Sequence, residues 1–91
     1  MTKINRVKQR LQAGERALVC WLHLSSPLAA EIVAQAGYDG VLIDHEHGPG
    51  DFLNAIALMQ ASGAGGCTPI MRVPWNDPVY IKRALDIGVQ G

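Results

Sequence analysis

Hydrophobic residues along the chain gather in short runs that are separated by turn and capping residues. Three runs have the length of a β-strand, at residues 17–23 (ALVCWLH), 40–44 (GVLID) and 68–73 (TPIMRV). The segments between and around them predict helices at 4–11, 28–36, 52–62 and 78–87. The run 40–44 is apolar up to its last residue, which is typical of a strand buried on both faces.

Capping residues support the boundaries of these helices. Ser26 and Pro27 supply an N-cap and a first-turn proline for the segment 28–36, and Asp77 and Pro78 do the same for 78–87. Asp51, after a Pro-Gly turn, is positioned to cap the segment that begins at residue 52. Glycines that can end a helix stand at Gly14, Gly37 and Gly88.

Strand and helix thus alternate three times after an N-terminal helix, which predicts an α/β fold with a parallel sheet. The stretch AGYDGVLI leads from one helix into the run 40–44, and IGVQG at residues 87–91 repeats its glycine spacing. We therefore expect a further strand directly after residue 91. Three strands alone would leave exposed sheet edges. We interpret residues 1–91 as one partial domain, the N-terminal portion of a larger α/β domain that is truncated here.

Composition and charge narrow the class of function. Eight Lys and Arg residues balance eight Asp and Glu residues, so no basic excess indicates a nucleic acid or an anionic membrane as a partner. The charged first 14 residues lack the apolar segment of a secretory signal, and no apolar run is long enough to span a membrane. These features predict a cytoplasmic protein. Cys20 and Cys67 are expected to be reduced, packed thiols.

Titratable residues are concentrated at the end of the second predicted strand, in the sequence Asp44-His45-Glu46-His47. In parallel α/β folds, side chains at the carboxyl ends of strands face the ligand-binding side. Arg72 occupies the matching position on the next strand. Its planar guanidinium can donate two parallel hydrogen bonds, which suits a carboxylate or phosphate ligand. His47 is a candidate general base, and Asp44 could fix its tautomer.

Other interpretations of these residues stay open. His47 could be a solvated loop residue, Asp44 could cap a turn, and Arg72 could form a structural ion pair. His45 and His47 could together bind a metal, but the sequence offers no evident third ligand. Trp21 and Trp75 are expected in the core or in a pocket wall. The glycines at 63, 65 and 66 lack the spacing of a nucleotide-binding loop.

Two sequence blocks lie at consecutive strand ends. Ile43, Asp44, Glu46 and His47 form the block I-D-x-E-H. Arg72, Trp75, Asn76, Asp77 and Pro78 form the block R-x-x-W-N-D-P. Both blocks resemble the HpcH/HpaI aldolase family of metal-dependent 2-oxo-acid aldolases, of the 4-hydroxy-2-oxoheptanedioate or 2-keto-3-deoxy sugar acid type. The stretch WLHLSSP (21–27) is similar to the family's first strand and turn. The resemblance covers essentially residues 4–91.

The resemblance implies a (β/α)8 barrel, of which this chain forms the N-terminal helix and about three βα units. It implies cleavage of a 4-hydroxy-2-oxo acid to pyruvate, or a related 2-oxo acid, and an aldehyde. By position, His47 would be the acid/base for the substrate 4-hydroxyl, Asp44 would pair with His47, and Arg72 would hold the pyruvyl group. Trp21 would line the pocket, Glu46 would not contact substrate, and His45, at the variable position of the block, would have no catalytic role.

The resemblance further implies a divalent metal ion, Mg²⁺, Mn²⁺ or Co²⁺, and a homo-oligomer for the full-length enzyme. The family's metal ligands, a Glu and an Asp, come from later strands, so we expect them beyond residue 91 and expect residues 1–91 alone to be inactive. Two alternatives remain: a related lyase on CoA thioesters or dicarboxylates, and a non-catalytic α/β module that self-associates through its sheet edges.

Overall fold

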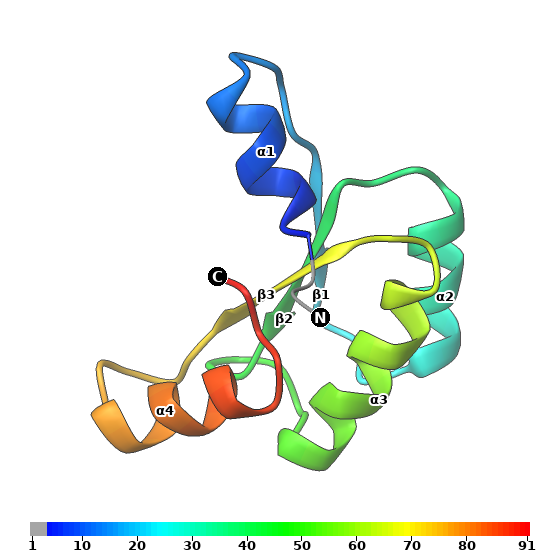
Figure 1. Ribbon diagram of the computed structural model, residues 1–91. Helices are drawn as coiled ribbons and strands as arrows, with labels where there is room; N and C mark the ends of the chain where they lie inside the picture. The colour runs from blue at the N-terminus through cyan, green and yellow to red at the C-terminus, as the bar shows by residue number, and fades with distance from the viewer. Residues whose placement is uncertain (1–3) are drawn as a thin grey trace.

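The computed structural model describes residues 4–91 and contains the seven elements that the hydrophobic pattern predicts, in the order helix, then three strand–helix pairs. The helices are α1 (Arg6–Gln12), α2 (Pro27–Gln35), α3 (Phe52–Gly63) and α4 (Pro78–Asp86). The strands are β1 (Val19–Leu22), β2 (Gly40–Asp44) and β3 (Thr68–Arg72). Figure 1 shows the strands crossing the middle of the molecule with the helices around them.

The three strands form one parallel sheet in the order β1-β2-β3, so each strand pairs with its neighbour in the sequence. The register places Leu22 beside Ile43, and Asp44 beside Arg72. After α4 the chain returns along β3, where the Gln90 backbone N–H donates to the Pro69 carbonyl at 2.8 Å. The α/β class and the parallel sheet predicted from the sequence are thus present.

The predicted caps close the helices as expected. The side chains of Ser26, Asp51 and Asp77 accept hydrogen bonds from backbone N–H groups in the first turns of α2, α3 and α4. Gly37 and Gly88 follow α2 and α4 with φ of 97° and 112°, a conformation that residues with a Cβ rarely adopt. The sequence therefore has a glycine after each of these two helices for the same physical reason, which is the positive φ at that position.

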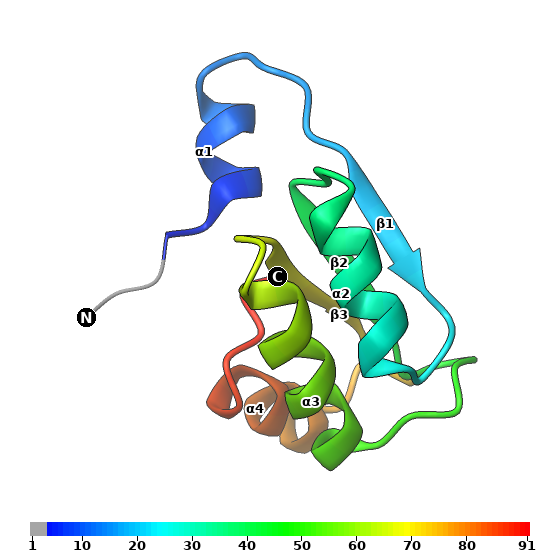
Figure 2. The ribbon, with the colours of Figure 1, turned by 90° about the vertical axis from the view of Figure 1, so that its right-hand side faces the viewer.

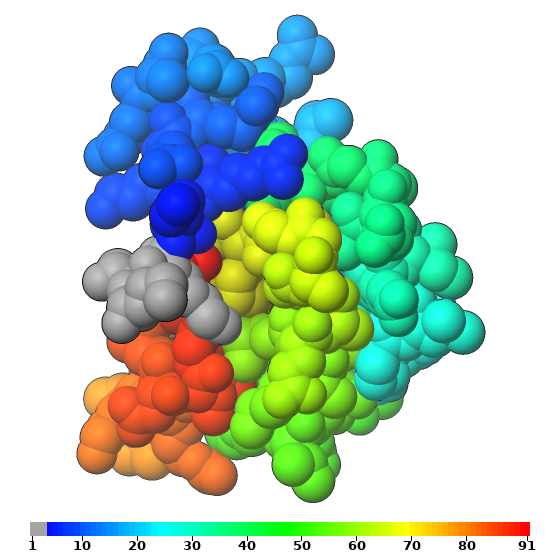
Figure 3. Space-filling model, turned by 45° about the vertical axis from the view of Figure 1, so that its right-hand side comes forward, coloured from blue at the N-terminus to red at the C-terminus, as the bar shows by residue number. Residues whose placement is uncertain are grey.

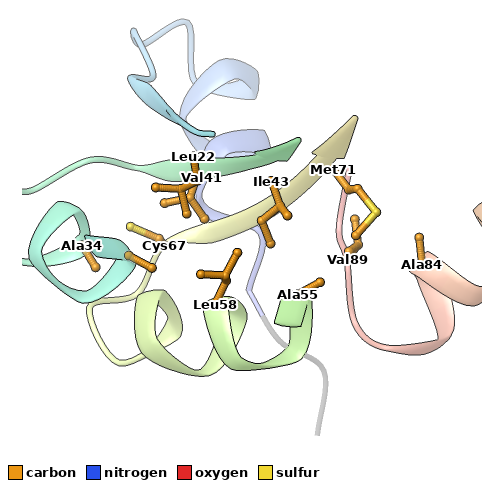
Figure 4. Packing of buried hydrophobic residues seen from close by; sticks show 11 residues of the cluster. Leu22, Ala34, Val41, Ile43, Ala55, Leu58, Cys67, Met71, Ala84 and Val89 are labelled. Carbon is orange, nitrogen blue, oxygen red and sulfur yellow. The ribbon is translucent and has the colours of Figure 1, made fainter. Parts of the chain in front are cut away.

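The hydrophobic core lies between the sheet and helices α2 and α3, which run side by side over one face of it (Figure 2). Val41 and Ile43 of β2 are buried and point toward Leu58 and Ala55 of α3 (Figure 4). Small residues let the elements approach closely, since Ala30 of α2 is completely buried. The expectation that β2 is buried on both faces is correct, because only Leu42 within it is partly exposed.

Helix α1 lies at the amino ends of the strands. Arg6 and Arg10 contact the buried carboxylate of Asp39, the residue before β2, at 3.2 and 3.5 Å. The Leu18 backbone N–H donates to the same carboxylate, and with the two arginines it lowers the pKa of Asp39. Figure 3 shows α1, in blue, at one end of the molecule and α4, in orange, at the other. The amino ends of the strands are therefore covered, whereas the carboxyl ends carry the candidate site.

Trp21 and Trp75 were expected in the core or in a pocket wall. Their side chains are 51% and 71% exposed, so neither belongs to the core, and a place in a pocket wall stays a prediction. Trp21 lies on β1, which pairs on one side only within residues 4–91, and Trp75 lies in the loop before α4. The cysteines are both free, but only Cys67 is buried, and burial raises the pKa of its thiol; Cys20 is partly exposed. None of the described helices is long and apolar enough to cross a membrane.

Candidate active site

The carboxyl ends of the three strands bring together the charged residues that the sequence singled out. Asp44 ends β2, Arg72 ends β3, and the two are direct partners in the sheet register. Trp21 lies near the end of β1, on the strand that pairs with β2 on its other side. The prediction that Asp44 and Arg72 occupy matching places on neighbouring strands is therefore correct.

The Asp44 carboxylate is fully buried and accepts hydrogen bonds on both oxygens. Oδ2 accepts from Arg72 Nη2 at 2.6 Å and from Trp21 Nε1 at 3.1 Å. Oδ1 accepts from Arg72 Nε at 3.2 Å and from the backbone N–H groups of Glu46 and His47 at 2.9 and 3.0 Å. The Arg72 guanidinium, aided by these other donors, holds the pKa of Asp44 far below its usual range. Asp44 is consequently a fixed anion and not a proton acceptor.

Arg72 is held from three directions. It pairs side-on with Asp44 through Nε and Nη2, and its Nη1 lies 3.2 Å from Glu46 Oε1. Its guanidinium carbon lies 4.7 Å from the centre of the Trp21 ring, within cation–π distance. The hydrogen bonds to Asp44 raise the pKa of Arg72. About one third of the side chain stays exposed, so one edge of the cation faces solvent.

The chain turns directly after β2, as the predicted approach of residues 44 and 47 requires. The turn is stabilised by the two backbone N–H groups that donate to Asp44 Oδ1. It leaves the His47 side chain 66% exposed, with ring Nε2 3.4 Å from Glu46 Oε1. In the structure Asp44 binds the backbone N–H of His47, and Glu46 is the carboxylate beside the ring.

His45 points away from this cluster. It is buried, its Nδ1 lies 2.8 Å from the Tyr80 hydroxyl, and its ring packs edge-on against Phe52 and Tyr80. The metal pair of His45 and His47 considered above is therefore not formed, since one ring is buried beside α4 and the other is exposed. Within residues 4–91 no three His, Cys, Asp or Glu side chains are grouped so that they could hold a metal ion.

Burial of His45 predicts a pH-dependent stability. Desolvation lowers the pKa of His45, and the opposing effects of Asp51 and Asp44 are smaller. A depressed pKa in the folded state means that the stabilising contribution is present above the unfolded pKa of about 6.5 and is lost as the pH falls through the folded pKa. We expect the melting temperature of the protein to fall between pH 7 and 5, and to fall less in His45→Gln. Thermal melts across this range test it, with exposed His23→Gln as the matched control; identical slopes in wild type and His45→Gln would contradict it.

His23 is a residue of the site that sequence reasoning did not single out. It lies one residue beyond β1, is 59% exposed, and places Nδ1 3.6 Å from Asp44 Oδ2. The sequence contains a signal for this role, because His23 directly follows the first strand, while Asp44 and Arg72 end the second and third strands. Two hollows in the described part of the chain, of about 560 and 350 Å³, are lined by none of the residues of this cluster. Trp21, His23 and His47 are each more than half exposed at the strand ends.

Chemically, the arrangement combines a cation on a fixed anion with an exposed imidazole and a second carboxylate. Arg72 can donate to a carboxylate or a carbonyl oxygen from its outer edge. The exposed His47 ring can reach a bound molecule and exchange a proton with it. This combination suits a small anionic substrate that gains or loses a proton.

Known proteins resemble this chain over nearly its whole length. A family model described as HpcH/HpaI aldolase/citrate lyase matches residues 17–91. A pyruvate aldolase from Rhizobium etli is 47% identical over 87 residues, which cover 96% of this chain and 34% of the relative. A 4-hydroxy-2-oxo-heptane-1,7-dioate aldolase from Escherichia coli is 43% identical over 86 residues, covering 94% of this chain and 33% of the relative.

A solved structure that matches this chain has a similar fold. The crystal structure of an HpcH/HpaI aldolase/citrate lyase family protein from Burkholderia cenocepacia matches with a TM-score of 0.83 and 43% identity, over 94% of this chain and 35% of that chain. The chain thus spans about a third of the length of these relatives. The match confirms the family resemblance and the partial-barrel fold that the resemblance implied.

Proposed function

Because the chain belongs to the HpcH/HpaI aldolase/citrate lyase family, we propose that the protein containing it cleaves a 4-hydroxy-2-oxo acid into pyruvate, or a related 2-oxo acid, and an aldehyde. The proposal applies to the whole protein, since the chain spans about a third of its relatives. We propose that this protein works in the cytoplasm as a homo-oligomer on small-molecule substrates.

The observation that carries the proposal is the pairing of Arg72 with Asp44 at adjacent strand ends, beside the exposed His47 ring. Arg72, held side-on by Asp44, would present its outer edge to the carboxylate or oxo group of the pyruvyl part. His47 would take the proton of the 4-hydroxyl when the carbon–carbon bond breaks, leaving an enolate near the cation. Trp21 would fix the plane of the guanidinium by stacking on it.

The metal ion is a separate part of the proposal. Asp44 and Glu46 are both engaged by Arg72, and the described residues do not form a metal site of their own. We therefore assign no step to a metal through these residues. A divalent ion, Mg²⁺, Mn²⁺ or Co²⁺, would be held by acids outside residues 4–91 and would polarise the 2-oxo group.

The experiment that tests the reaction uses the whole protein with added divalent metal. It is incubated with a panel of 4-hydroxy-2-oxo acids that differ in the aldehyde half, and pyruvate release is followed with a coupled dehydrogenase. We expect release from at least one member of the panel. Because the family name also includes citrate lyase, CoA thioesters and dicarboxylates are tested in parallel. Turnover of these alone would replace the aldolase proposal with a related lyase.

Arg72→Lys provides a test of the role of the guanidinium. An ammonium cannot donate two parallel hydrogen bonds, so it cannot hold Asp44 side-on and also present a second edge to substrate. We expect kcat/KM for the oxo acid to fall by at least about tenfold. Steady-state kinetics of the whole protein measure this change, with exposed Arg83→Lys on α4 as the control. Unchanged kinetics in Arg72→Lys would leave Arg72 with a structural role only.

A further inference from the structure

Glu46 contacts both residues to which the proposed reaction assigns a task. Its Oε1 lies 3.2 Å from Arg72 Nη1 and 3.4 Å from His47 Nε2. The family resemblance implies only that Glu46 does not contact substrate, and these two contacts are consistent with that. Its side chain is 37% exposed and stands in a turn rather than in a strand, so the carboxylate has room to change partners.

The hydrogen bonds of Arg72 show which of its partners can be exchanged. Nε and Nη2 donate to Asp44, which is completely buried and held by Trp21 and by backbone N–H groups as well. That pairing is fixed. Nη1 contacts only the partly exposed Glu46 among the described residues. A substrate carboxylate that binds the outer edge of Arg72, across Nη1 and the second N–H of Nη2, therefore shares Nη1 with Glu46.

We propose that Glu46 is a positioning residue with two partners, which it exchanges when the 2-oxo acid binds: it leaves Arg72 as the substrate carboxylate takes Nη1, and then pairs with His47 alone. The inference rests on the proposed function. Two carboxylates on one N–H edge repel each other, so arrival of the second favours departure of the first. Beside His47, the Glu46 anion stabilises the imidazolium that forms when the ring takes the substrate proton.

Other charged groups around His47 do not replace Glu46 in this role. Asp44 binds the His47 backbone, and its charge is already neutralised by Arg72. Arg72 is a cation and disfavours an imidazolium. His23, from β1, contacts Asp44 at 3.6 Å, and no contact between His23 and His47 is found in the described part of the chain. Glu46 is therefore the anion placed to act on the His47 ring.

The exchange predicts opposite effects on binding and turnover in Glu46→Gln. Removing a carboxylate that competes for Arg72 should tighten substrate binding, so KM and the product inhibition constant of pyruvate fall about two- to fivefold, the scale of a partly exposed ion pair. Removing the anion beside His47 should lower kcat by at least about tenfold. A side chain that merely supports the fold would not lower KM and kcat together.

The test compares wild type, Glu46→Gln, Glu46→Asp and the control Glu31→Gln, an exposed position on α2, in the whole protein with the best oxo acid of the panel. We expect Glu46→Asp to recover part of the lost kcat and Glu31→Gln to match wild type. A higher or unchanged KM in Glu46→Gln would overturn the exchange.

A measurement on wild type avoids dependence on the variants. In ¹⁵N-histidine spectra, saturating pyruvate should move the His47 ring resonances toward imidazolium values; unchanged resonances at saturation would overturn the exchange. Failure of the proposed function is distinct, because then wild type releases no pyruvate at all.

Discussion

His47→Ala should lower kcat for aldol cleavage by about 10² to 10⁴, the usual range for loss of a general acid or base. The ring is 66% exposed, and its Nε2 is contacted only weakly, at 3.4 Å from Glu46. Its removal should therefore leave the melting temperature within a degree or two of wild type, because exposed side chains contribute little to stability. Steady-state kinetics and thermal melts of the whole protein measure both quantities. Bound divalent metal should also be retained, since His47 is not part of a metal site among the described residues.

His45 supplies the control for this prediction because it is a neighbouring histidine with the opposite environment. It is buried against Tyr80 and Phe52 and does not face Arg72. His45→Gln should stay within a few-fold of wild type in kcat at pH 7.5, while it changes stability. If His45→Gln were inactive and His47→Ala active, or if either change abolished metal binding, the assignment of the acid/base would be wrong.

Asp44→Asn should reduce both stability and activity. The carboxylate accepts from Arg72 and Trp21 on one oxygen and from two backbone N–H groups on the other. An asparagine must direct its own NH₂ group at one of these sets of donors, so several buried hydrogen bonds are lost. We expect the free energy of unfolding to fall by about 2 to 4 kcal/mol. Displacement of Arg72 and of the turn bearing His47 should lower kcat/KM by about 10².

Asp39→Asn is the matched control, because Asp39 is also a buried, ion-paired acid and lies at the opposite end of β2. It holds α1 through Arg6 and Arg10 rather than any residue of the candidate site. Asp39→Asn should lower stability but leave kcat/KM of the folded protein unchanged. Equal losses of kcat/KM in the two variants, measured well below their melting temperatures, would show that Asp44 acts through global stability alone.

Much of the fold follows from local sequence signals. Strand β3 is Thr68–Arg72 where 68–73 was predicted, and α4 is Pro78–Asp86 where 78–87 was predicted. Apolar runs of limited length, side-chain caps and terminal glycines act within a few residues, so they can be read without knowledge of the rest of the chain. Strand β1 is shorter than predicted, Val19–Leu22 against 17–23, because only these four residues pair with β2.

The candidate site was predictable in position but not in its contacts. The sequence placed Asp44 and Arg72 at the same edge of the sheet, since parallel strands end on the same side, and the observed register pairs them directly. The sequence did not reveal that Asp44 would bind the backbone of residues 46 and 47, and this turn moves the His47 ring toward Glu46. His23 was missed, and Trp21, which was expected in the core or in a pocket wall, is half exposed. Side-chain orientations after a turn depend on such hydrogen bonds rather than on the strand's alternation.

The central claim is that these strand ends belong to an enzyme that forms the enolate of pyruvate. Exchange of the pyruvate methyl protons with solvent deuterium tests it most directly, because it requires no knowledge of the aldehyde half. The whole protein with divalent metal is incubated with pyruvate in D₂O, and the methyl signal is followed by ¹H NMR. The account predicts loss of this signal at a rate proportional to protein concentration, and a rate at least about tenfold slower in Arg72→Lys. An unchanged methyl signal, from a protein that also releases no pyruvate from any hydroxy-oxo acid, would contradict it.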